Sequence, residues 1–406
     1  MGGVVFMKDT RIRLNLAGFM EKLRTRIQPY PWGSHSAIAA LRGEPPTSEP
    51  QAELWAGAHP SAPSQLFRGG QWVDLDALIA DDPATELGED VAERFGERLP
   101  FLAKILAAGQ PLSLQTHPDP AAARAGFVRE NAAGVPIDAP NRTYRDDSAK
   151  PEILIALTPF EGLCGFRPVA ETLHFLDELN VEMLRPFADT LRASSNADGL
   201  RSVVESFLRH DLRNRTTLID SIVAAATTYS GAQAGLADWI GRLNSLYPND
   251  IGIAISLLLN HVVLSPGEAL FLKAGNLHAY LCGMGVEVMA NSDNVLRAGF
   301  TGKHIDIPEL LSITDFTPLA DPLFRPVVAQ TDHAVVTTFR PPVRDFAVER
   351  FDLDGSGELR LNSDGPSILI CTSGSVHDLA PTEAAYARPG ISTLTGSGTV
   401  WRVTTG

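Results

Sequence analysis

The chain has 406 residues, of which 44% are hydrophobic and 20% are charged, a composition typical of a folded protein with more than one domain. Its formal net charge of −14 argues against nucleic acid or an anionic membrane surface as a partner. No apolar run approaches the ~18–20 residues of a membrane span, and the 3 cysteines lie too far apart for a disulfide framework. We therefore expect a cytoplasmic protein.

The N-terminal stretch "MGGVVFMKDTRIRLNLAGF" has only short apolar runs and no small-residue cleavage site, so it does not predict a signal peptide. Met20 begins "MEKLRTRIQPYPWGS", which reads like a fresh start of the chain. We expect residues 1–19 to be an N-terminal extension without a function.

Short apolar runs separated by turn residues come next, and they predict strands. The stretch "PFLAKILAAGQPLSLQTHP" gives two consecutive strands divided by "AGQP". A helix is expected after it, because Asp119 can act as the N-cap and Pro120 occupies the first helical position. The run Glu152–Leu157 predicts a buried strand.

The second half of the chain changes pattern twice. Apolar residues recur at spacings of three and four over 169–264, which predicts a helical insertion. Strand-like sequence resumes over 265–324, where the "GMG" at Gly283 is expected to form a turn. We expect 20–168 and 265–324 to form one domain, and 325–406, rich in Val, Thr, Gly and Pro, to form an all-β module.

Polar residues alternate with apolar ones at the end of the strand that contains "LSLQTH". Because side chains on a strand point to opposite faces in turn, Ser113, Gln115 and His117 share one face and Leu114 lies on the other. An edge strand facing water and a barrel interior open to a ligand both explain this pattern. The segment alone leaves both interpretations open.

Two other segments favour the barrel interior. Glu152 opens a strongly apolar strand, where a carboxylate is costly unless it is paired or bound to a metal. "LSPGEALFLKAGNLHAYL" resembles the signature of cupin barrels, in which His278 would point inward. Together with Gln115 and His117, these residues form a mixed nitrogen and oxygen set suited to a divalent first-row metal such as zinc.

Six stretches occur in the order found in one enzyme family: "QPYPWGS", "AELWAGAHP", "LPFLAKILAAGQPLSLQTHPD", "KPEILIALTPFEGLCGFRP", "SPGEALFLKAGNLHAYL" and "GVEVMANSDNVLRAGFTGKHID". Through them the chain resembles type I mannose-6-phosphate isomerase (phosphomannose isomerase) from about Gln28 to Asp306. The combination of "NSDNVLRAGFTGKH" and "QTHPD" is the most specific part of this resemblance.

The resemblance implies a mainly β fold: a cupin/jelly-roll barrel, an α-helical insertion and a second, jelly-roll-like C-terminal module. It implies a zinc-dependent aldose–ketose isomerase that interconverts D-mannose 6-phosphate and D-fructose 6-phosphate through an enediol, with one Zn²⁺ per chain. Such a site often accepts Co, Mn or Ni as well. Small sugar phosphates are then the partners, without nucleic acid or membrane, and we expect a monomer or a weak homo-oligomer.

The resemblance also assigns roles to individual positions. The zinc ligands fall on Gln115, His117, Glu152 and His278. The catalytic positions fall on Arg297, Lys150, Glu287, Asp293 and His59. The phosphate-binding positions fall on Lys104, Ser113 and Lys303. We expect Arg297 to stabilise the enediolate and Lys150 and Glu287 to transfer protons. We expect Asp293 and His59 to open the sugar ring.

Two other functions are compatible with a metal-binding barrel. An iron oxygenase of the same fold would consume oxygen, but it leaves the phosphate-side lysines without a role. A sugar-phosphate binding protein that had lost catalysis would bind the substrate without turnover, and the intact set of ligands with Arg297 argues against it.

Overall fold

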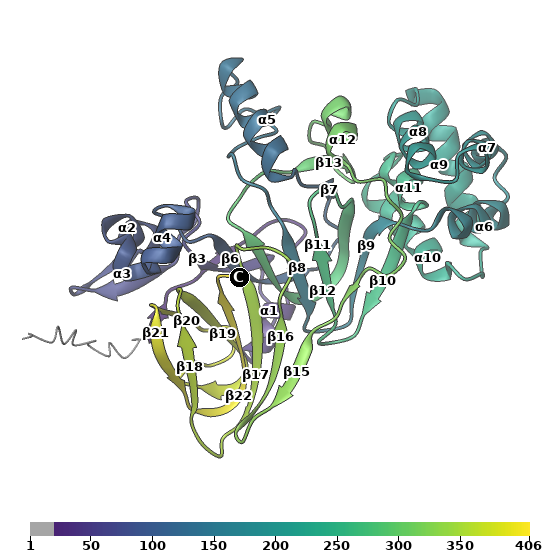
Figure 1. Ribbon diagram of the computed structural model, residues 1–406. Helices are drawn as coiled ribbons and strands as arrows, with labels where there is room; N and C mark the ends of the chain where they lie inside the picture. The colour runs from purple at the N-terminus through teal and green to yellow at the C-terminus, as the bar shows by residue number, and fades with distance from the viewer. Residues whose placement is uncertain (1–19) are drawn as a thin grey trace, which may run out of the picture.

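The computed structural model describes residues 20–406, apart from the side chains of residues 212 and 213, so the expectation for residues 1–19 lies outside the described part. Figure 1 shows a central body of strands with a group of helices on one side and a second group of strands against it. The expected mainly β architecture is confirmed. Within residues 20–406, no helix is long and apolar enough to cross a membrane.

The central body is an 11-stranded antiparallel sheet that forms two halves around one shared strand. Its strands are β2 (Arg26–Gln28), β3 (Glu53–Gly57), β6 (Phe101–Ala108), β7 (Leu114–Thr116), β8 (Glu152–Ala156), β9 (Phe160–Phe166), β10 (Leu259–Leu264), β11 (Ala269–Leu272), β12 (His278–Ala290), β13 (Leu296–Gly299) and β14 (Leu323–Phe324). The path β14-β11-β8-β12-β6-β3-β2 is one half, and β7, β9, β10 and β13 form the other. The two halves enclose the interior of a barrel.

The long strand β12 joins the two halves. Its first residues pair with β7 and β9, and after a bulge between Tyr280 and Cys282 it pairs with β6 and β8. Gly283, at φ +115°, makes this change possible, because a Cβ there would lie 2.6 Å from the carbonyl oxygen of Pro159. The expectation of a turn at Gly283 is wrong, because this residue lies inside β12. A strand that changes partners needs the same backbone freedom as a turn, so the sequence alone does not distinguish the two.

Strand β6 shows how the barrel separates its interior from its exterior. Lys104 and Leu106 face the interior, while Ala103 and Ile105 pack outward into an apolar cluster that includes Trp401 of the C-terminal module. The exterior of the other half packs against the helices instead. Both outer faces of the barrel are therefore covered, and this fixes the strands that carry the interior polar groups.

Helices cover one side of the barrel, as the spacing of apolar residues predicts. They are α6 (Val169–Leu179), α7 (Arg185–Ala193), α8 (Ala197–Leu208), α9 (Leu212–Thr227), α10 (Ala234–Leu246) and α11 (Gly252–Ser256). The helical part ends earlier than expected, because β10 follows α11 directly and pairs with β9 of the barrel. A continuous apolar run hides this boundary, since a buried helix and a buried strand read alike.

The C-terminal module contains a 7-stranded sheet and a 2-stranded sheet. Its strands are β15 (Val327–Gln330), β16 (Ala334–Phe339), β17 (Ala347–Asp354), β18 (Leu359–Ser363), β19 (Ser367–Val376), β20 (Ala384–Ala387), β21 (Gly390–Leu394) and β22 (Gly396–Thr404). One further strand comes from the other end of the chain, because β1 (Met20–Leu23) pairs with β20. The strand that begins at Met20 thus belongs to the sheet of the C-terminal module.

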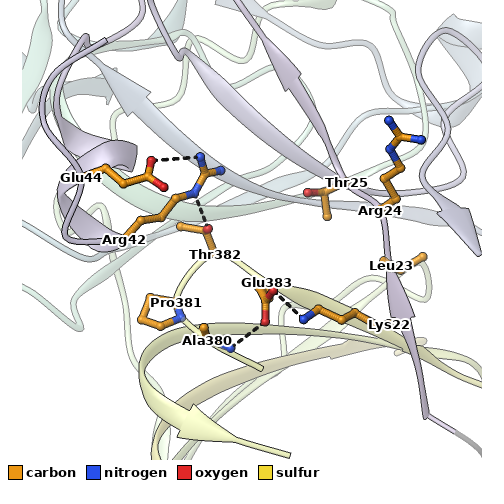
Figure 2. Close-up of a pocket in the computed structure, with 10 residues that line it drawn as sticks. All are labelled: Lys22, Leu23, Arg24, Thr25, Arg42, Glu44, Ala380, Pro381, Thr382 and Glu383. Atoms are coloured by element: carbon orange, nitrogen blue, oxygen red, sulfur yellow. Dashed lines mark hydrogen bonds and ion pairs between the residues drawn. The ribbon is translucent and has the colours of Figure 1, made fainter. Parts of the chain in front are cut away.

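A surface cavity of about 520 Å³ lies where the chain around β1 meets the C-terminal module, next to the short helix α1 (Ala37–Leu41) (Figure 2). Lys22 pairs with Glu383 at 2.5 Å, and Arg42 Nε donates a hydrogen bond to Thr382 Oγ1 at 2.7 Å. Arg42 also lies 3.7 Å from Glu44. Both of these cations therefore have a carboxylate partner.

The helix expected after the "QTHPDP" stretch is confirmed as α5 (Pro120–Ala132). Asp119 Oδ1 accepts hydrogen bonds from the backbone N–H groups of Ala121 and Ala122 at 2.8 and 2.7 Å, so it caps the helix as expected. The remaining elements are β4 (Gln65–Arg68), β5 (Gln71–Asp74), α2 (Leu75–Asp81), α3 (Pro83–Leu87), α4 (Glu89–Phe95), α12 (Ile307–Ile313) and the short 3₁₀ helix η1 (Glu182–Leu184).

Candidate active site

Three buried side chains converge inside the barrel from three different strands. His117 follows the last residue of β7, Glu152 opens β8, and His278 opens β12. The Nε2 atoms of His117 and His278 lie 3.5 and 3.4 Å from Glu152 Oε2. The side chains are only 1–2% exposed, so water does not compete for these atoms.

Backbone carbonyl groups orient both histidines. His117 Nδ1 lies 2.7 Å from the carbonyl oxygen of Asn294, and His278 Nδ1 lies 2.9 Å from that of Asn276. A carbonyl oxygen only accepts hydrogen bonds, so each Nδ1 carries the proton and donates it. The lone pair of each Nε2 is then directed at the centre, as in metal-binding histidines held by an outer hydrogen bond.

The site fits a divalent metal ion. Both Nε2 atoms and Glu152 Oε2 are buried, and none of them has a hydrogen-bond partner among the described residues. Separations of 3.4–3.5 Å are long for hydrogen bonds. They match the ~3.4 Å between two ligands held at ~2.0–2.1 Å by a tetrahedral ion. His117, Glu152 and His278 also form the group of potential ligands that the described residues bring together.

The protonation states suit metal binding. Burial lowers the pKa of His117 to about 4, although the neighbouring Glu152 opposes this shift. Burial raises the pKa of Glu152, but Lys150 and the two histidines outweigh it and hold the pKa well below its usual range. Lys150 Nζ lies 3.0 Å from Glu152 Oε1. At neutral pH the centre therefore presents a neutral imidazole and a carboxylate, the forms that bind a metal.

Gln115 lies on β7, between strands β12 and β13. It pairs in register with His278 of β12 on one side and with Arg297 of β13 on the other. Because β7 has a partner on both sides, the edge-strand interpretation of this segment is wrong. Gln115 Oε1 accepts a hydrogen bond from Ser113 Oγ at 3.3 Å. Its place as fourth ligand stays a prediction.

A buried cluster of three charges lies on the neighbouring strands. Lys104 Nζ is 2.9 Å from Glu287 Oε2 and 3.2 Å from Glu53 Oε1, and all three side chains are at most 7% exposed. Burial lowers the pKa of Lys104, but the two carboxylates outweigh it and raise the pKa above its usual range. Burial raises the pKa of Glu287, and Lys104 opposes that shift. Lys104 therefore carries two carboxylate partners inside the protein.

His59 and Asp293 form a second pair near the centre. His59 Nε2 lies 3.4 Å from Asp293 Oδ1, and Nδ1 lies 2.8 Å from Ser61 Oγ. Burial raises the pKa of Asp293, but the hydrogen bond and charge of His59 outweigh it and lower the pKa below its usual value. The Asp293 side chain is 45% exposed, so this pair borders a space that is open to solvent.

That space is a pocket of about 580 Å³ at the mouth of the barrel. Its lining residues are Pro140, Asn141, Arg142, Thr143, Arg145, Asp293, Val295, Arg297, Gly302, Lys303 and His304. Burial, and then the charge of Arg145, lower the pKa of Arg297. The charge of Arg297 is the main cause that lowers the pKa of Lys303. The pocket is therefore rich in positive charge.

Sequence reasoning missed several residues that shape this site. Glu53 carries the same signal as Glu152, a carboxylate at the start of a buried strand, and it was open to the same argument. Asn276 and Asn294 orient the histidines through backbone carbonyls, which no side-chain pattern reveals. Arg145 reaches the pocket from a loop without a regular pattern.

A mainly β barrel with a buried His-Glu-His set and a cationic pocket at its mouth defines a metal-binding protein of the cupin class. The comparisons with known proteins name the family. Residues 20–169 match the catalytic domain of phosphomannose isomerase type I, and residues 339–376 match its C-terminal domain.

Related proteins match over nearly the whole chain. The chain is 40% identical over 377 residues to a mannose-6-phosphate isomerase of Escherichia coli, covering 92% of this chain and 94% of that protein. It is 34% identical over 408 residues to one of Aspergillus fumigatus, covering 87% of this chain and 86% of the relative. A solved structure of a zinc-bound mannose 6-phosphate isomerase is 37% identical, with a TM-score of 0.87, and covers 95% of this chain and 99% of its own.

The chain belongs to the type I phosphomannose isomerase family. The resemblance predicted from the motifs is confirmed, and three of the expected metal ligands, His117, Glu152 and His278, converge in the structure.

Proposed function

We propose that the chain interconverts D-mannose 6-phosphate and D-fructose 6-phosphate at the centre made by Gln115, His117, Glu152 and His278, with zinc as the resident ion. The observation that carries this proposal is the convergence of three buried ligand atoms without hydrogen-bond partners. The names of the relatives and the zinc-bound neighbour support the same reading.

The reaction moves hydrogen between neighbouring carbon atoms of the open-chain sugar. A base removes the proton from C2 of the aldose, and the electrons form the enediol as the oxygen on C1 gains a proton. The oxygen on C2 then loses its proton while a proton is delivered to C1. When bound, a divalent metal ion supplies Lewis acidity beside the carbonyl group. The protein must then hold the sugar, stabilise the enediolate charge and transfer the proton.

Arg297 is our candidate for stabilising the enediolate. It pairs in register with Gln115, a proposed metal ligand, and it lines the pocket, so we place it beside the reacting carbons of the bound sugar. An arginine stays protonated across working pH even where burial lowers its pKa. A fixed cation of this kind stabilises developing negative charge, and it is a poor base.

Lys150 and Glu287 are our candidates for proton transfer. Lys150 is buried and within 3.0 Å of the metal ligand Glu152, so its state is linked to the charge of the centre. The pKa of the Glu287 carboxyl is raised by burial, against the effect of Lys104, and this brings a carboxyl closer to the range of a useful base. Lys104 is then needed to keep Glu287 and Glu53 charged and in place.

The His59–Asp293 pair is our candidate for opening the sugar ring. Ring opening needs one group to take the proton of the anomeric hydroxyl and another to give a proton to the ring oxygen. A histidine has two ring nitrogens, and here one contacts a carboxylate and the other the Ser61 hydroxyl, so it can accept a proton on one side and donate one on the other. Ser113 and Lys303 are our candidates for binding the phosphate group of the substrate. The same role for Lys104 stays a prediction.

Incubation of the purified protein with mannose 6-phosphate in deuterated water tests the proposal. We expect fructose 6-phosphate to accumulate and solvent deuterium to enter the sugar, because the transferred proton exchanges with water. Oxygen uptake in place of isomerisation would support an iron oxygenase, and binding without product would support a binding protein that lacks catalysis. Either result would overturn the proposal.

Arg297→Gln is expected to lower kcat by roughly 10²- to 10³-fold, because the enediolate loses its fixed cation. Arg325→Gln is a matched control, since Arg325 is exposed and its ion pair within residues 20–406 is with Asp321 on the surface. Steady-state kinetics and solvent exchange at C2 measure both variants. Near-normal turnover by Arg297→Gln would show that the enediolate is stabilised elsewhere.

A further inference from the structure

We propose that Arg145 binds the substrate's phosphate group and completes, with Lys303, an anion subsite that selects phosphorylated sugars. The inference rests on the proposed function, because the phosphate is that of the proposed substrate. Arg145 has no assigned role in the sequence motifs, and it lies on the loop between α5 and β8.

The geometry of the pocket carries this inference. Arg145, Arg297 and Lys303 line the same space of about 580 Å³. Among the described residues, none of the three side chains makes an ion pair or a hydrogen bond. In the cavity of Figure 2, by contrast, Lys22 and Arg42 have carboxylate partners and Arg24 lies over the Trp72 ring. With Arg297 reserved for the enediolate, Arg145 and Lys303 are two cations without partners that can bind a dianion in this concave space.

The charges also affect one another. Arg297 and Arg145 both contribute to lowering the pKa of Lys303, and Arg145 contributes to lowering that of Arg297. Like charges held this close repel each other, and a bound phosphate group would relieve the repulsion. Asp293 is the one carboxylate among the described residues that line the pocket, and His59 already pairs with it.

The backbone of Arg145 is tied to the metal centre. The N–H group of Arg145 donates a hydrogen bond to Asn294 Oδ1 at 2.7 Å, and the carbonyl oxygen of Asn294 accepts the Nδ1 proton of His117. One residue thus sets the position of both the loop and a metal ligand. The backbone of Arg145 is thus tied to a residue that orients a metal ligand, and its exposed side chain lines the pocket.

The chemistry predicts which kinetic constant changes. The phosphate group is remote from C1 and C2 and keeps its charge throughout the reaction, so contacts to it stabilise the ground state and the transition state alike. Loss of such a contact raises KM and leaves kcat nearly unchanged. An arginine can bind two phosphate oxygens in its fork, which a lysine cannot do.

Arg145→Gln, Arg145→Lys and the control Arg124→Gln test the inference in the zinc-loaded enzyme. Arg124 is exposed on α5, so its substitution removes the same charge outside the pocket. For Arg145→Gln we expect KM for mannose 6-phosphate and the inhibition constant for inorganic phosphate both to rise roughly 10- to 100-fold. We expect Arg145→Lys to recover part of the loss and Arg124→Gln to match the wild type.

The outcomes distinguish a failure of the proposed function from a failure of the phosphate-binding role of Arg145. If the wild-type enzyme does not isomerise mannose 6-phosphate, the proposed function fails. If it does and Arg145→Gln behaves like Arg124→Gln, the inference is wrong while the function stands. A fall in kcat with unchanged KM and unchanged phosphate inhibition would also overturn the inference. Melting temperatures equal to that of the wild type would show that the variants fold normally.

Discussion

Glu152→Gln is expected to abolish isomerisation, with a fall in kcat/KM of roughly 10³-fold or more, and to release most of the bound zinc. Glu152 is the only anionic ligand among the residues that converge in the centre, and its Oε2 atom faces both histidines. Loss of an outer-shell partner costs about 10- to 100-fold in affinity or activity, and loss of a charged ligand exceeds this. Metal content by atomic emission and steady-state kinetics measure the two effects.

Glu161→Gln is the matched control for that experiment. Glu161 also contacts a histidine, since its Oε2 lies 2.9 Å from His261 Nε2, but it binds Trp239 rather than a second histidine. A glutamine oxygen can accept the same hydrogen bonds, so we expect this variant to keep its zinc and its activity. A Glu152→Gln enzyme that retained zinc and turnover would show that the metal lies elsewhere.

Lys104→Met is expected to lower the free energy of unfolding by roughly 3–5 kcal/mol, because it leaves two buried carboxylates without their cation. Lys104 is the shared partner of Glu53 and Glu287, and methionine fills a similar volume without a charge. Catalysis should be lost as well, since Glu287 is our candidate for proton transfer. Urea denaturation of the zinc-loaded proteins measures the loss of stability.

The control for this variant is Lys273→Met, in which an exposed lysine loses the surface carboxylate Asp315. A surface pair of this kind contributes about 0–1 kcal/mol. The loss in Lys104→Met should also grow with pH. Without the lysine, the buried carboxylates have raised pKa values in the folded state, so the fold is disfavoured as pH rises and they must ionise. Equal losses for both variants would show that Lys104 does not hold the cluster together.

Local sequence patterns predicted those parts of the site that depend on one strand. Alternation along "LSLQTH" separated Leu114 from Gln115 and His117, and the structure confirms that Leu114 packs toward the helices. The cap at Asp119 was equally local. Such features are visible because neighbouring residues determine them.

Features that depend on distant pairing were beyond the sequence. Lys104 and Glu287 are 183 residues apart, and only the pairing of β6 with β12 brings them together. Gly283 was expected in a turn because its backbone freedom serves a turn and a strand crossing equally well. Arg145 belongs to a loop whose position depends on Asn294, 149 residues away.

The proposed function depends most directly on a metal-dependent isomerisation at His117, Glu152 and His278. The decisive measurement follows fructose 6-phosphate formation from mannose 6-phosphate by the purified protein before chelation, after chelation and after zinc is returned. We predict activity with about one zinc per chain, its loss on chelation and its recovery with zinc. Full activity in the metal-free protein, or none in the zinc-loaded protein, would contradict the account.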